Sequence, residues 1–513
     1  MSPSLRPLSL ARYRRALGRL VTAPSEIVEA QHPPRPSEPE DFHVRESRIT
    51  GPDIARLLAQ EPVSFWWTDD VKGGLTRLCA TADHAADVLR ALLKLAERES
   101  LAVEQRHRRT NALLESSTRA ALQTLSAERF VRLVVQDMRS AAPPLTFSVE
   151  LWSASPEGHL SSPNNNPLVS RIWHSTAQAR GGLSGAWHLD DLLGVPAAEV
   201  VPFEVDWVFS WVDASDPAWQ ELFAAWAPEE ASDASDRSRF ATRDDLKFAM
   251  RSLELYAPWI RTIHVLTNCR PPDWLDTDHP RIHWVDHSEV FEAEHLPTFS
   301  SHAIETVVHR IPGLAEHFVY SNDDFFLTRA TEPSDFFHSN GIARLRLEPY
   351  GIVNGPATPG DPDYLNGARN SAELLAAEFG RTPVRLHTHS PQSMNRTVLA
   401  EMESKYADGF ARTRGNRFRD STDIAVTGFL YHHYAFLTGR AVPDGAATLL
   451  IQQNHRYVRL FSQLLAAQDT GQLSKYLSVC VNDGRGSHDN ADWDAQARAF
   501  LSTYFTEKSS FER

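Results

Sequence analysis

The sequence lacks several features that would assign it to a specialised class of protein. Only three cysteines, Cys79, Cys269 and Cys480, occur in 513 residues, and none belongs to a C-x-x-C pair. A disulfide framework and a zinc knuckle are therefore not indicated, and this cysteine usage is typical of a reducing compartment. No apolar run reaches about 18 residues, so the sequence predicts no membrane-spanning helix. No internal repeat is found.

Basic residues are also in short supply. Lys and Arg number 52 against 66 Asp and Glu, which gives a formal net charge of −14. A nucleic-acid partner would call for a basic face, so we expect none. The same charge repels a phosphorylated substrate, which local cations or a metal must then attract. Hydrophobic residues at 42% and charged residues at 23% describe a globular protein, and the chain is long enough for more than one core.

We predict three regions: a basic segment with a proline-rich linker over 1–44, an α+β accessory region over 45–200, and a third region over 201–513. The first 20 residues are basic and weakly amphipathic but lack the apolar stretch of a signal peptide. A short surface helix and a helix lying on a membrane surface both fit them. The expected location is the cytoplasm, with peripheral association at the inner face of the membrane as the alternative.

Two patterns define the predicted accessory region. Apolar residues recur at three- and four-residue spacing from about 82 to 137, which predicts helices. Residues 145–174 read "LTFSVELW", then a polar turn at "SPNNNP", then "LVSRIW", which predicts a hairpin. Neither pattern indicates a function for this region.

Strands and helices alternate from residue 203 onward. A helix is predicted over 300–311, with a serine cap at its start and Pro312 and Gly313 after its end. Such alternation with short connections predicts a mostly parallel, doubly wound α/β sheet. Ligands bind such sheets beyond the carboxyl ends of the strands, where the polar residues gather in this sequence. The predicted strands are 204–212, 261–268, 281–287 and 317–323.

The stretch "VYSNDDFFL" sets Asn322, Asp323 and Asp324 between two hydrophobic flanks. Adjacent ionised carboxylates repel each other unless a cation or hydrogen-bond donors compensate. A hard divalent cation would be satisfied by these oxygens and could bridge phosphate oxygens. The alternative is a helix cap or an Asx turn that leads into "FFL".

Other candidates are ambiguous when each is taken alone. In "SWVDASDPAW", Asp213 and Asp216 lie beside tryptophans that could stack on a base or a sugar, but a turn containing Ser-Asp-Pro explains Asp216 equally well. His389 follows a β-like run and could exchange a proton near neutral pH, although most of the 22 histidines must be structural. Arg419 could bind phosphate or form a surface ion pair with Asp420 or Asp423. The "CVNDG" stretch over 480–484 fits a plain β-turn.

Taken together and in order, these motifs resemble the Stealth family. Its members are bacterial capsular and exopolysaccharide sugar-1-phosphate transferases, related to the eukaryotic enzyme that transfers N-acetylglucosamine 1-phosphate to lysosomal enzymes. The resemblance covers most of 203–513, which would make 201–513 a Stealth-type catalytic domain. Four blocks carry it: "FEVDWVFSWVDASDPAW", the run from "RDDLKFAM" to "VYSNDDFFL", "HSPQSMNRTVLAEM" with "RFRDSTDI", and "VCVNDG" with "FLSTYFTEKSSFE".

The resemblance implies a role for each residue that matches a family motif. It implies catalytic roles for His389, Asp324, Arg419 and Asp213, and metal binding by Asp323, Asp324 and Asp483. It implies substrate binding by Asp206, Arg251, Asn268, Asp244, Asn322 and Asn482. The chain also departs from the family pattern: Gln392 replaces the second histidine of H-x-P-H, and Ala214 and Cys269 replace glycines. His302 lies where some relatives have proline.

The chemistry that the resemblance implies is transfer of a hexose 1-phosphate, in particular an N-acetylhexosamine 1-phosphate, from a UDP-sugar. The acceptor is a saccharide hydroxyl or a growing polysaccharide, UMP leaves, and the cofactor is Mg²⁺ or Mn²⁺. His389 and Asp324 are rival candidates for the base. Two alternatives remain: a metal-dependent glycosyltransferase that releases UDP, and a non-enzymatic carbohydrate-binding protein. The sequence leaves open which hexose and acceptor are used, and the oligomeric state.

Overall fold

The computed structural model describes residues 51–70, 75–106, 113–115, 117–137, 145–164, 169–173, 185–189, 198–227, 240, 242–469, 474–484, 487 and 490–513. The predicted basic segment and linker over 1–44 lie outside these residues. Within the described part of the chain, none of the helices combines the length and the apolarity that crossing a bilayer requires.

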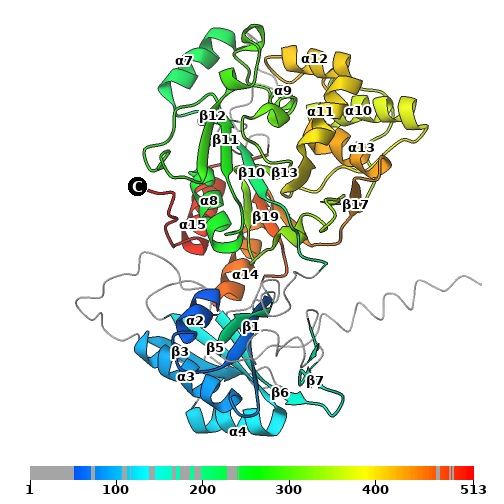
Figure 1. Cartoon of the computed structure of the whole chain (residues 1–513). Coiled ribbons are helices and arrows are strands. Elements are labelled where there is room, and N and C mark those ends of the chain that lie inside the picture. The colour runs from blue at the N-terminus through cyan, green and yellow to red at the C-terminus, as the bar shows by residue number, and fades with distance from the viewer. Residues whose placement is uncertain are drawn as a thin grey trace, which may run out of the picture. The chain divides into compact units, whose positions relative to one another are not determined.

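The accessory region contains a mixed sheet in the order β4–β3–β5–β6–β2–β1–β9, with β7 and β8 added beside β6. Helices α2, α3 and α4 pack against it (Figure 1). This agrees with the α+β class predicted for the region. The elements are α2 Gly51–Leu58, β1 Phe65–Asp70, β2 Leu75–Thr81, α3 Ala85–Arg98, β3 Leu101–Arg106, β4 Leu113–Glu115, α4 Thr118–Glu128, β5 Phe130–Asp137, β6 Leu145–Ala154, β7 His159–Ser161, β8 Arg171–Trp173 and β9 Ala186–His188.

Two local predictions for this region need correction. The helical prediction over 82–137 holds for α3 and α4, but β3, β4 and β5 are strands. The residues of β5, "FVRLVVQD", are rich in β-branched and aromatic side chains, which favour a half-buried strand over a helix. In the predicted hairpin, β6 does not pair with β8 directly, because β7 lies between them and pairs with both.

The region from residue 201 onward is built on a parallel sheet in the order β12–β11–β10–β13–β16, in which only β16 is antiparallel. The first strand is central, the next two extend to one side and the fourth to the other, which is the doubly wound arrangement. The predicted mostly parallel α/β fold is therefore confirmed. The elements are β10 Val205–Ser210, α7 Pro217–Trp226, α8 Asp245–Tyr256, β11 Ile263–Thr267, β12 Ile282–Asp286, α9 Ser301–Glu305, β13 His317–Asn322, β14 Phe325–Leu327, β15 Ala343–Leu345, α10 Asp363–Phe379, β16 Gln392–Asn395, α11 Arg396–Lys405, α12 Ala407–Gly415, α13 Tyr431–Leu437, β17 Ala441–Pro443, β18 Thr448–Ile451, α14 Tyr457–Asp469, β19 Ser478–Val481 and α15 Ala491–Tyr504.

The predicted helix over 300–311 is shorter than expected. Helix α9 ends at Glu305, and only a 3₁₀ turn follows at Val308–Arg310. The Thr306 hydroxyl donates a hydrogen bond to the carbonyl of Ala303 at 2.7 Å, and such local bonds compete with helix continuation. Ser300 does cap α9 as predicted, because its side chain accepts a hydrogen bond from the N–H of Ala303.

A second small sheet has the order β14–β19–β18. Strand β14 begins just after β13 ends, and it pairs antiparallel with β19 so that Phe325 lies opposite Cys480. The residues just before β14 therefore meet the residues just after β19, although about 150 residues separate them.

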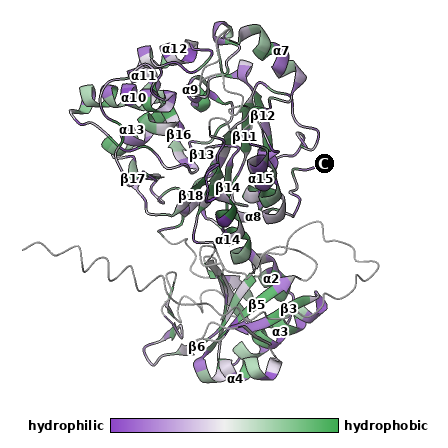
Figure 2. Cartoon of the chain, turned by 180° about the vertical axis from the view of Figure 1, so that it is seen from behind, coloured by the Kyte–Doolittle hydropathy of each residue, from purple (hydrophilic) through white to green (hydrophobic). Residues whose placement is uncertain are grey.

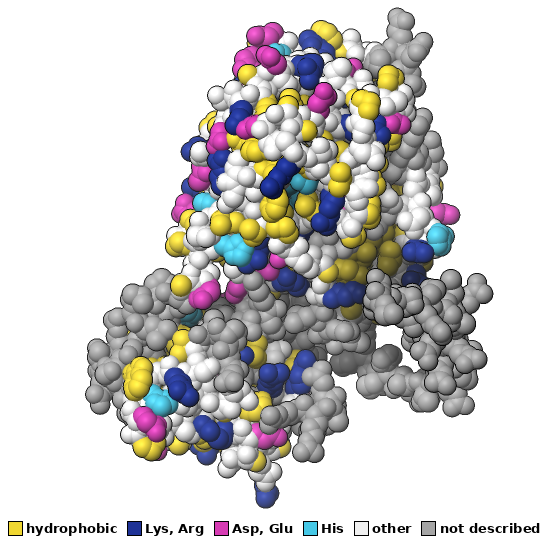
Figure 3. Space-filling model, turned by 90° about the vertical axis from the view of Figure 1, so that its right-hand side faces the viewer, with side chains coloured by type: hydrophobic (Ala, Val, Ile, Leu, Met, Phe, Trp, Pro, Cys, Tyr) yellow, Lys and Arg dark blue, Asp and Glu magenta, His cyan; other side chains and the backbone are white. Residues whose placement is uncertain are grey.

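The buried apolar side chains fall into separate clusters. The largest contains residues from Val205 to Phe511, while two others lie within 54–189. Figure 2 shows the hydrophobic strands of the main sheet between helices with polar residues on their outer faces. The face seen in Figure 3 carries Lys and Arg side chains together with Asp and Glu side chains among hydrophobic ones.

Candidate active site

The carboxyl ends of β10 and β13 bring the first predicted site residues together. Ser210, the last residue of β10, pairs with Asn322, the last residue of β13. The Ser210 hydroxyl donates a hydrogen bond to Asn322 Oδ1 at 3.0 Å, and its oxygen lies 2.9 Å from the Tyr320 hydroxyl. Asn322 is exposed at this edge, where doubly wound sheets bind their ligands.

The two aspartates that follow β13 form a half-buried pair. Burial raises the pKa of Asp323 well above its ordinary value, and the carboxylates of Asp245 and Asp324 raise it further. Burial also raises the pKa of Asp324, against the opposing effect of hydrogen bonds from Asn482 and Cys480. Asp324 Oδ1 is buried and accepts no hydrogen bond. Ionisation of both carboxyls is therefore disfavoured, because the surrounding side chains do not compensate two negative charges.

The pairing of β14 with β19 brings Asn482 to these aspartates. Asn482 Nδ2 donates a hydrogen bond to Asp324 Oδ2 at 3.0 Å. Its own Oδ1 accepts a hydrogen bond from Gln452 at 3.2 Å, and the Val481 N–H donates to the Asp324 carbonyl at 3.0 Å. Asn482 thus orients one of the two carboxylates, a contact that a plain β-turn would not require.

Arg243, which the sequence analysis did not single out, forms ion pairs with Asp483 and Asp245. Its Nη1 donates hydrogen bonds to both carboxylate oxygens of Asp483, at 2.7 and 2.8 Å. Its Nη2 lies 3.6 Å from Asp245 Oδ1, and burial raises the pKa of that carboxyl to about 6. Asp483 Oδ1 also accepts a hydrogen bond from the Trp493 indole at 2.8 Å. The only sequence signal for Arg243 is its place beside two aspartates in "RDD".

These contacts determine which of the predicted side chains are available to bind a metal ion. In the described residues, no group of three or more His, Cys, Asp or Glu side chains is arranged to hold a metal ion. The Asp483 carboxylate accepts hydrogen bonds from Arg243 and Trp493. It therefore does not join Asp323 and Asp324 in the predicted group of three metal-binding aspartates. Asp323 and Asp324 remain, with one buried oxygen that lacks a partner. Mg²⁺ is commonly held by one or two carboxylates together with substrate phosphates and waters, so this pair fits such an ion.

Two more of the four predicted catalytic residues, His389 and Arg419, come from later segments of the chain. His389 precedes β16, whose first residue, Gln392, lies opposite Tyr320 of β13. Its side chain is exposed, and its electrostatic effect lowers the pKa of Asp324. Arg419 is half-buried, and its positive charge lowers the pKa of Tyr320, against the larger effect of burial. His389 thus acts electrostatically on Asp324, and Arg419 acts on Tyr320 of β13.

Three further candidates lie on loops at or near the same edge. Asn268 follows β11, and its Nδ2 is buried without a hydrogen-bond partner. Asp213 follows β10, where its Oδ1 accepts a hydrogen bond from the Ser215 N–H at 2.8 Å and its own N–H donates to Cys269 Sγ at 3.3 Å. Asp244 is exposed before α8 with a left-handed φ of 64°. Their predicted roles stay predictions.

The structure does not bring two predicted substrate-binding residues to this site. Asp206 is fully buried near the start of β10, where it accepts hydrogen bonds from Arg261, His264 and the Ala315 N–H. Arg251 forms a two-point ion pair with Glu512 at 2.7 Å. The contacts of both are with side chains and backbone groups of the fold, so we propose that both contribute to its stability.

Asp216, for which a turn was the alternative, is also structural. Its Oδ1 accepts the Ala218 N–H at 3.0 Å at the start of α7 and pairs with the Arg270 guanidinium at 2.9 Å. A carboxylate at a helix N-terminus is the usual capping arrangement.

Comparison with known proteins gives two kinds of match. Residues 239–345 match Stealth protein CR2, conserved region 2, and residues 388–436 match Stealth protein CR3, conserved region 3. "Capsular polysaccharide phosphotransferase SacB" of Neisseria meningitidis serogroup A is 48% identical over 353 residues, which cover 68% of this chain and 65% of that protein. "Exopolysaccharide phosphotransferase CpsY" of Mycobacterium leprae is 39% identical over 378 residues, which cover 72% and 68%.

Likeness to solved structures is weaker. A crystal structure of the galactosyltransferase LgtC covers 60% of this chain and 97% of that chain, at 11% identity and a TM-score of 0.31. This value is too low to support any conclusion. The chain spans just under two thirds of the length of SacB.

The fold and the site define an α/β protein with a carboxylate and amide cluster at the carboxyl edge of a doubly wound sheet. The matches to Stealth conserved regions 2 and 3, together with 39% identity to CpsY over more than two thirds of both chains, show to which family this α/β protein belongs. The chain belongs to the Stealth family.

Proposed function

We propose that this chain transfers an N-acetylhexosamine 1-phosphate from a UDP-sugar to a hydroxyl group of a saccharide, with release of UMP. The names of SacB and CpsY describe capsular and exopolysaccharide phosphotransferases, which supports sugar-phosphate transfer in polysaccharide synthesis. The structural observation that carries the proposal is the under-compensated pair Asp323 and Asp324 beside His389. We expect the protein in the cytoplasm, as the sequence predicts.

The proposed reaction is an in-line displacement at phosphorus. The oxygen of the acceptor hydroxyl attacks the phosphorus that carries the sugar, and the bond from that phosphorus to the bridging oxygen of UMP breaks. The bridging electron pair leaves with UMP, and the hydroxyl proton passes to a base. The product is a sugar–phosphate–sugar diester. Such a step depends on positioning and on charge neutralisation more than on covalent catalysis.

We assign roles to the residues of the site by what each can supply. Asp323 and Asp324 would hold a divalent cation, which when bound neutralises phosphate charge. Asn482 keeps the Asp324 carboxylate in place through its 3.0 Å hydrogen bond. Arg419 would donate charge-assisted hydrogen bonds to the diphosphate. His389 is exposed beside Asp324 and would accept the proton of the acceptor hydroxyl.

The experiment that tests the proposal is a single analysis of the released nucleotide. The protein is incubated with UDP-N-acetylglucosamine, Mg²⁺ or Mn²⁺ and an oligosaccharide acceptor, and the nucleotides are separated by chromatography. We expect UMP that disappears with EDTA and returns with added metal. Release of UDP would establish glycosyl transfer instead. Ligand binding with no nucleotide release, unchanged in Asp323→Ala, would support a carbohydrate-binding protein. A panel of UDP-sugars in the same assay identifies the hexose.

A further inference from the structure

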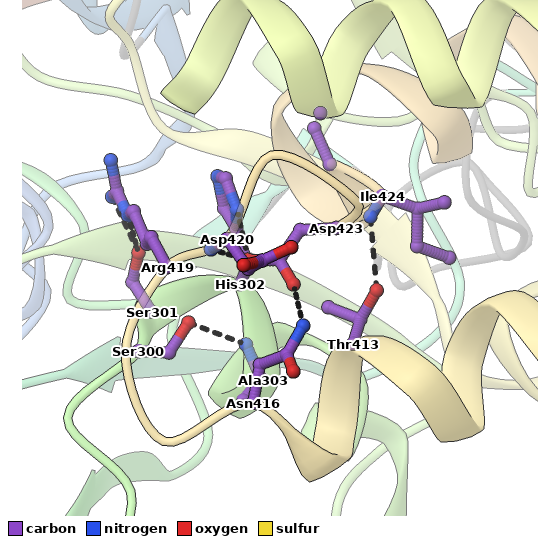
Figure 4. A network of polar contacts seen from close by, with 12 residues as sticks. Ser300, Ser301, His302, Ala303, Thr413, Asn416, Arg419, Asp420, Asp423 and Ile424 are labelled. Atoms are coloured by element: carbon purple, nitrogen blue, oxygen red, sulfur yellow. Dashed lines mark hydrogen bonds and ion pairs between the residues drawn. The ribbon is translucent and has the colours of Figure 1, made fainter. Parts of the chain in front are cut away.

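The loop that carries Arg419 is fastened to the first turn of α9 by two consecutive residues (Figure 4). Ser301 contacts Arg419, and His302 contacts Asp423, four residues further along the loop. Ser301 was assigned no role in the sequence analysis, and Asp423 appeared there only as a possible surface ion-pair partner of Arg419, whereas it is buried and contacts His302. The two contacts hold a segment that follows α12 against a helix more than 100 residues earlier in the chain.

Ser301 fixes the direction of the Arg419 side chain. Arg419 Nε and Nη2 donate hydrogen bonds to Ser301 Oγ, at 3.1 and 2.5 Å. A planar guanidinium that is held through two of its nitrogens has a defined plane, which sets where its other donors point. The Ser301 hydroxyl is not needed to cap α9, because the side chain of Ser300 does so.

Asp423 fixes the shape of the loop. It is fully buried, and its Oδ1 accepts a hydrogen bond from Asn416 Nδ2 at 2.7 Å. Its Oδ2 accepts the Asp420 N–H at 2.9 Å and lies 3.1 Å from His302 Nδ1. One carboxylate therefore joins both ends of the loop to α9, with Arg419 between them.

This fastened loop lies close to the candidate site. The positive charge of Arg419 acts on Tyr320, and the Tyr320 hydroxyl oxygen lies 2.9 Å from Ser210 Oγ. Ser210 in turn donates to Asn322 Oδ1 at 3.0 Å, directly before the two aspartates. Arg419 therefore acts electrostatically on a residue of β13 two positions before Asn322.

We propose that Ser301, together with the His302–Asp423 contact, positions the Arg419 guanidinium for the diphosphate of the nucleotide sugar. The inference rests on the proposed function, because it takes Arg419 as a diphosphate ligand. Ser301 and His302 are positioning residues and act on the substrate only through Arg419. The loop has other attachments to this segment, including the Phe299 N–H donating to the Arg417 carbonyl at 2.7 Å, so losing one hydroxyl leaves the loop in place.

The first experiment compares two neighbouring serines in the full-length protein. In Ser301→Ala, the Arg419 guanidinium loses the hydroxyl that fixes its direction. We expect the KM for UDP-N-acetylglucosamine and the Kd for UDP to rise about three- to tenfold, as for loss of one hydrogen bond. The Kd is measured by calorimetry. The kcat changes less, and the thermal midpoint is unchanged. Ser301→Thr keeps a hydroxyl and restores KM. Ser300→Ala is the matched control, since it loses a helix cap and lowers the thermal midpoint without changing KM.

The second experiment is a double-mutant cycle. If Ser301 acts through Arg419, then Ser301→Ala has no further effect on the Kd for UDP once Arg419 is alanine. Asp423→Asn should weaken UDP binding in the same direction as Ser301→Ala, and this effect should also vanish in the Arg419→Ala background.

The outcomes separate this inference from the proposed function. Additive losses in the cycle, or a Ser301→Ala variant equal to the unmodified protein while Arg419→Ala is impaired, overturn the positioning role and leave the proposed function standing. Full UDP binding by Arg419→Ala removes Arg419 from the diphosphate site, and the inference fails with it. Release of UDP instead of UMP changes the reaction but leaves the cycle interpretable.

Discussion

At the scale of single residues, the informative property of Asp323 is that its charge is costly in the folded protein. A carboxyl whose pKa is raised by folding destabilises the protein increasingly as pH rises through the folded value. Natural sequences retain such a group where a ligand compensates for it. The unfavourable charge of Asp323 and its proposed role in cation binding therefore have the same origin.

Asp323→Asn should separate activity from stability. We expect kcat for UMP release to fall by about a hundredfold or more, since several kcal/mol of charge stabilisation at phosphorus are lost. In EDTA at pH 8 the variant should be at least as stable to urea as the unmodified protein, because a repulsive charge is removed. Asp408→Asn, an exposed residue of α12, is the control and should change neither quantity. Marked destabilisation by Asp323→Asn would mean that the carboxylate is structural.

His389→Ala tests the proton acceptor. A general base typically contributes about 10²–10⁴-fold in rate, so kcat for UMP release should fall within that range while the Kd for UDP stays the same. The measurement is a steady-state rate with a saturating acceptor. A loss smaller than about threefold would transfer the role of base to Asp324.

Asp206→Asn tests the correction made for that residue. Burial alone would raise the pKa of Asp206, but hydrogen bonds from His264, Arg261 and the Ala315 N–H lower it to about 2. The group therefore stabilises the fold above its unfolded pKa, and this contribution is lost as pH falls from about 4 toward 2. We expect Asp206→Asn to lower the free energy of unfolding by roughly 3 kcal/mol at pH 7 and to flatten its dependence on pH below 4.

The same variant should keep its KM for the nucleotide sugar at temperatures where it is folded. A raised KM with unchanged stability would restore the substrate-binding role that the family resemblance implies for Asp206.

Residue identity alone could not separate ligand-binding charges from structural ones. Asp323 and Asp206 both lie on strand-adjacent apolar runs, and both match family motifs. What distinguishes them is the partner: Asp206 meets Arg261 and His264, while Asp323 meets other carboxylates. Those partners come from distant segments, so no local pattern in the sequence reports them.

At the scale of secondary-structure elements, the carboxyl-terminal segment is fastened to α8. Arg251 pairs with both oxygens of Glu512, and Ser510 donates a hydrogen bond to Glu254 through its N–H at 2.7 Å. The Phe511 side chain is fully buried in the main core. The segment therefore completes the packing of α8 rather than the active site.

Glu512→Gln should accordingly affect stability and not catalysis. The buried Arg251 would keep hydrogen bonds but lose its counter-charge, so we expect the free energy of unfolding to fall by about 2–3 kcal/mol. Urea denaturation measures this. Glu507→Gln, in the same segment, is the comparison variant. An unchanged unfolding curve with a reduced kcat would place Arg251 back among the substrate ligands.

The strands were easier to predict than the helices. Each predicted parallel strand, such as 261–268, contains the observed one because a fully buried strand leaves a continuous apolar run in the sequence. The helical prediction failed at β5, where the spacing of apolar residues fits both structures. Its β-branched and aromatic residues favour a strand, and β5 pairs with β3 and β6. Likewise, the edge that gathers Asn322 and the aspartates could be predicted from strand order, whereas Arg243 could not.

At the scale of the whole molecule, the main core is self-contained. Among the described residues, its buried apolar side chains all come from 205–511, and the cores within 54–189 are separate from it. A fragment of residues 201–513 should therefore unfold in one cooperative transition.

The same fragment should release UMP in the assay above. Calorimetric scanning of the fragment and of the full chain is the measurement, and two transitions are expected for the full chain. Failure of the fragment to fold would show that the accessory region contributes to stability, and a folded fragment without UMP release would assign that region a part in catalysis.

The antiparallel contact between β14 and β19 has a consequence for how the protein is made. Because Asp324 is synthesised long before Asn482, a nascent chain already contains Asp323 and Asp324 but lacks the Asn482 amide that donates a hydrogen bond to Asp324. The strand that brings this amide also covers one edge of β14. Chains interrupted before residue 478 would therefore expose that edge and lack this amide, so under the proposed function we expect them not to release UMP.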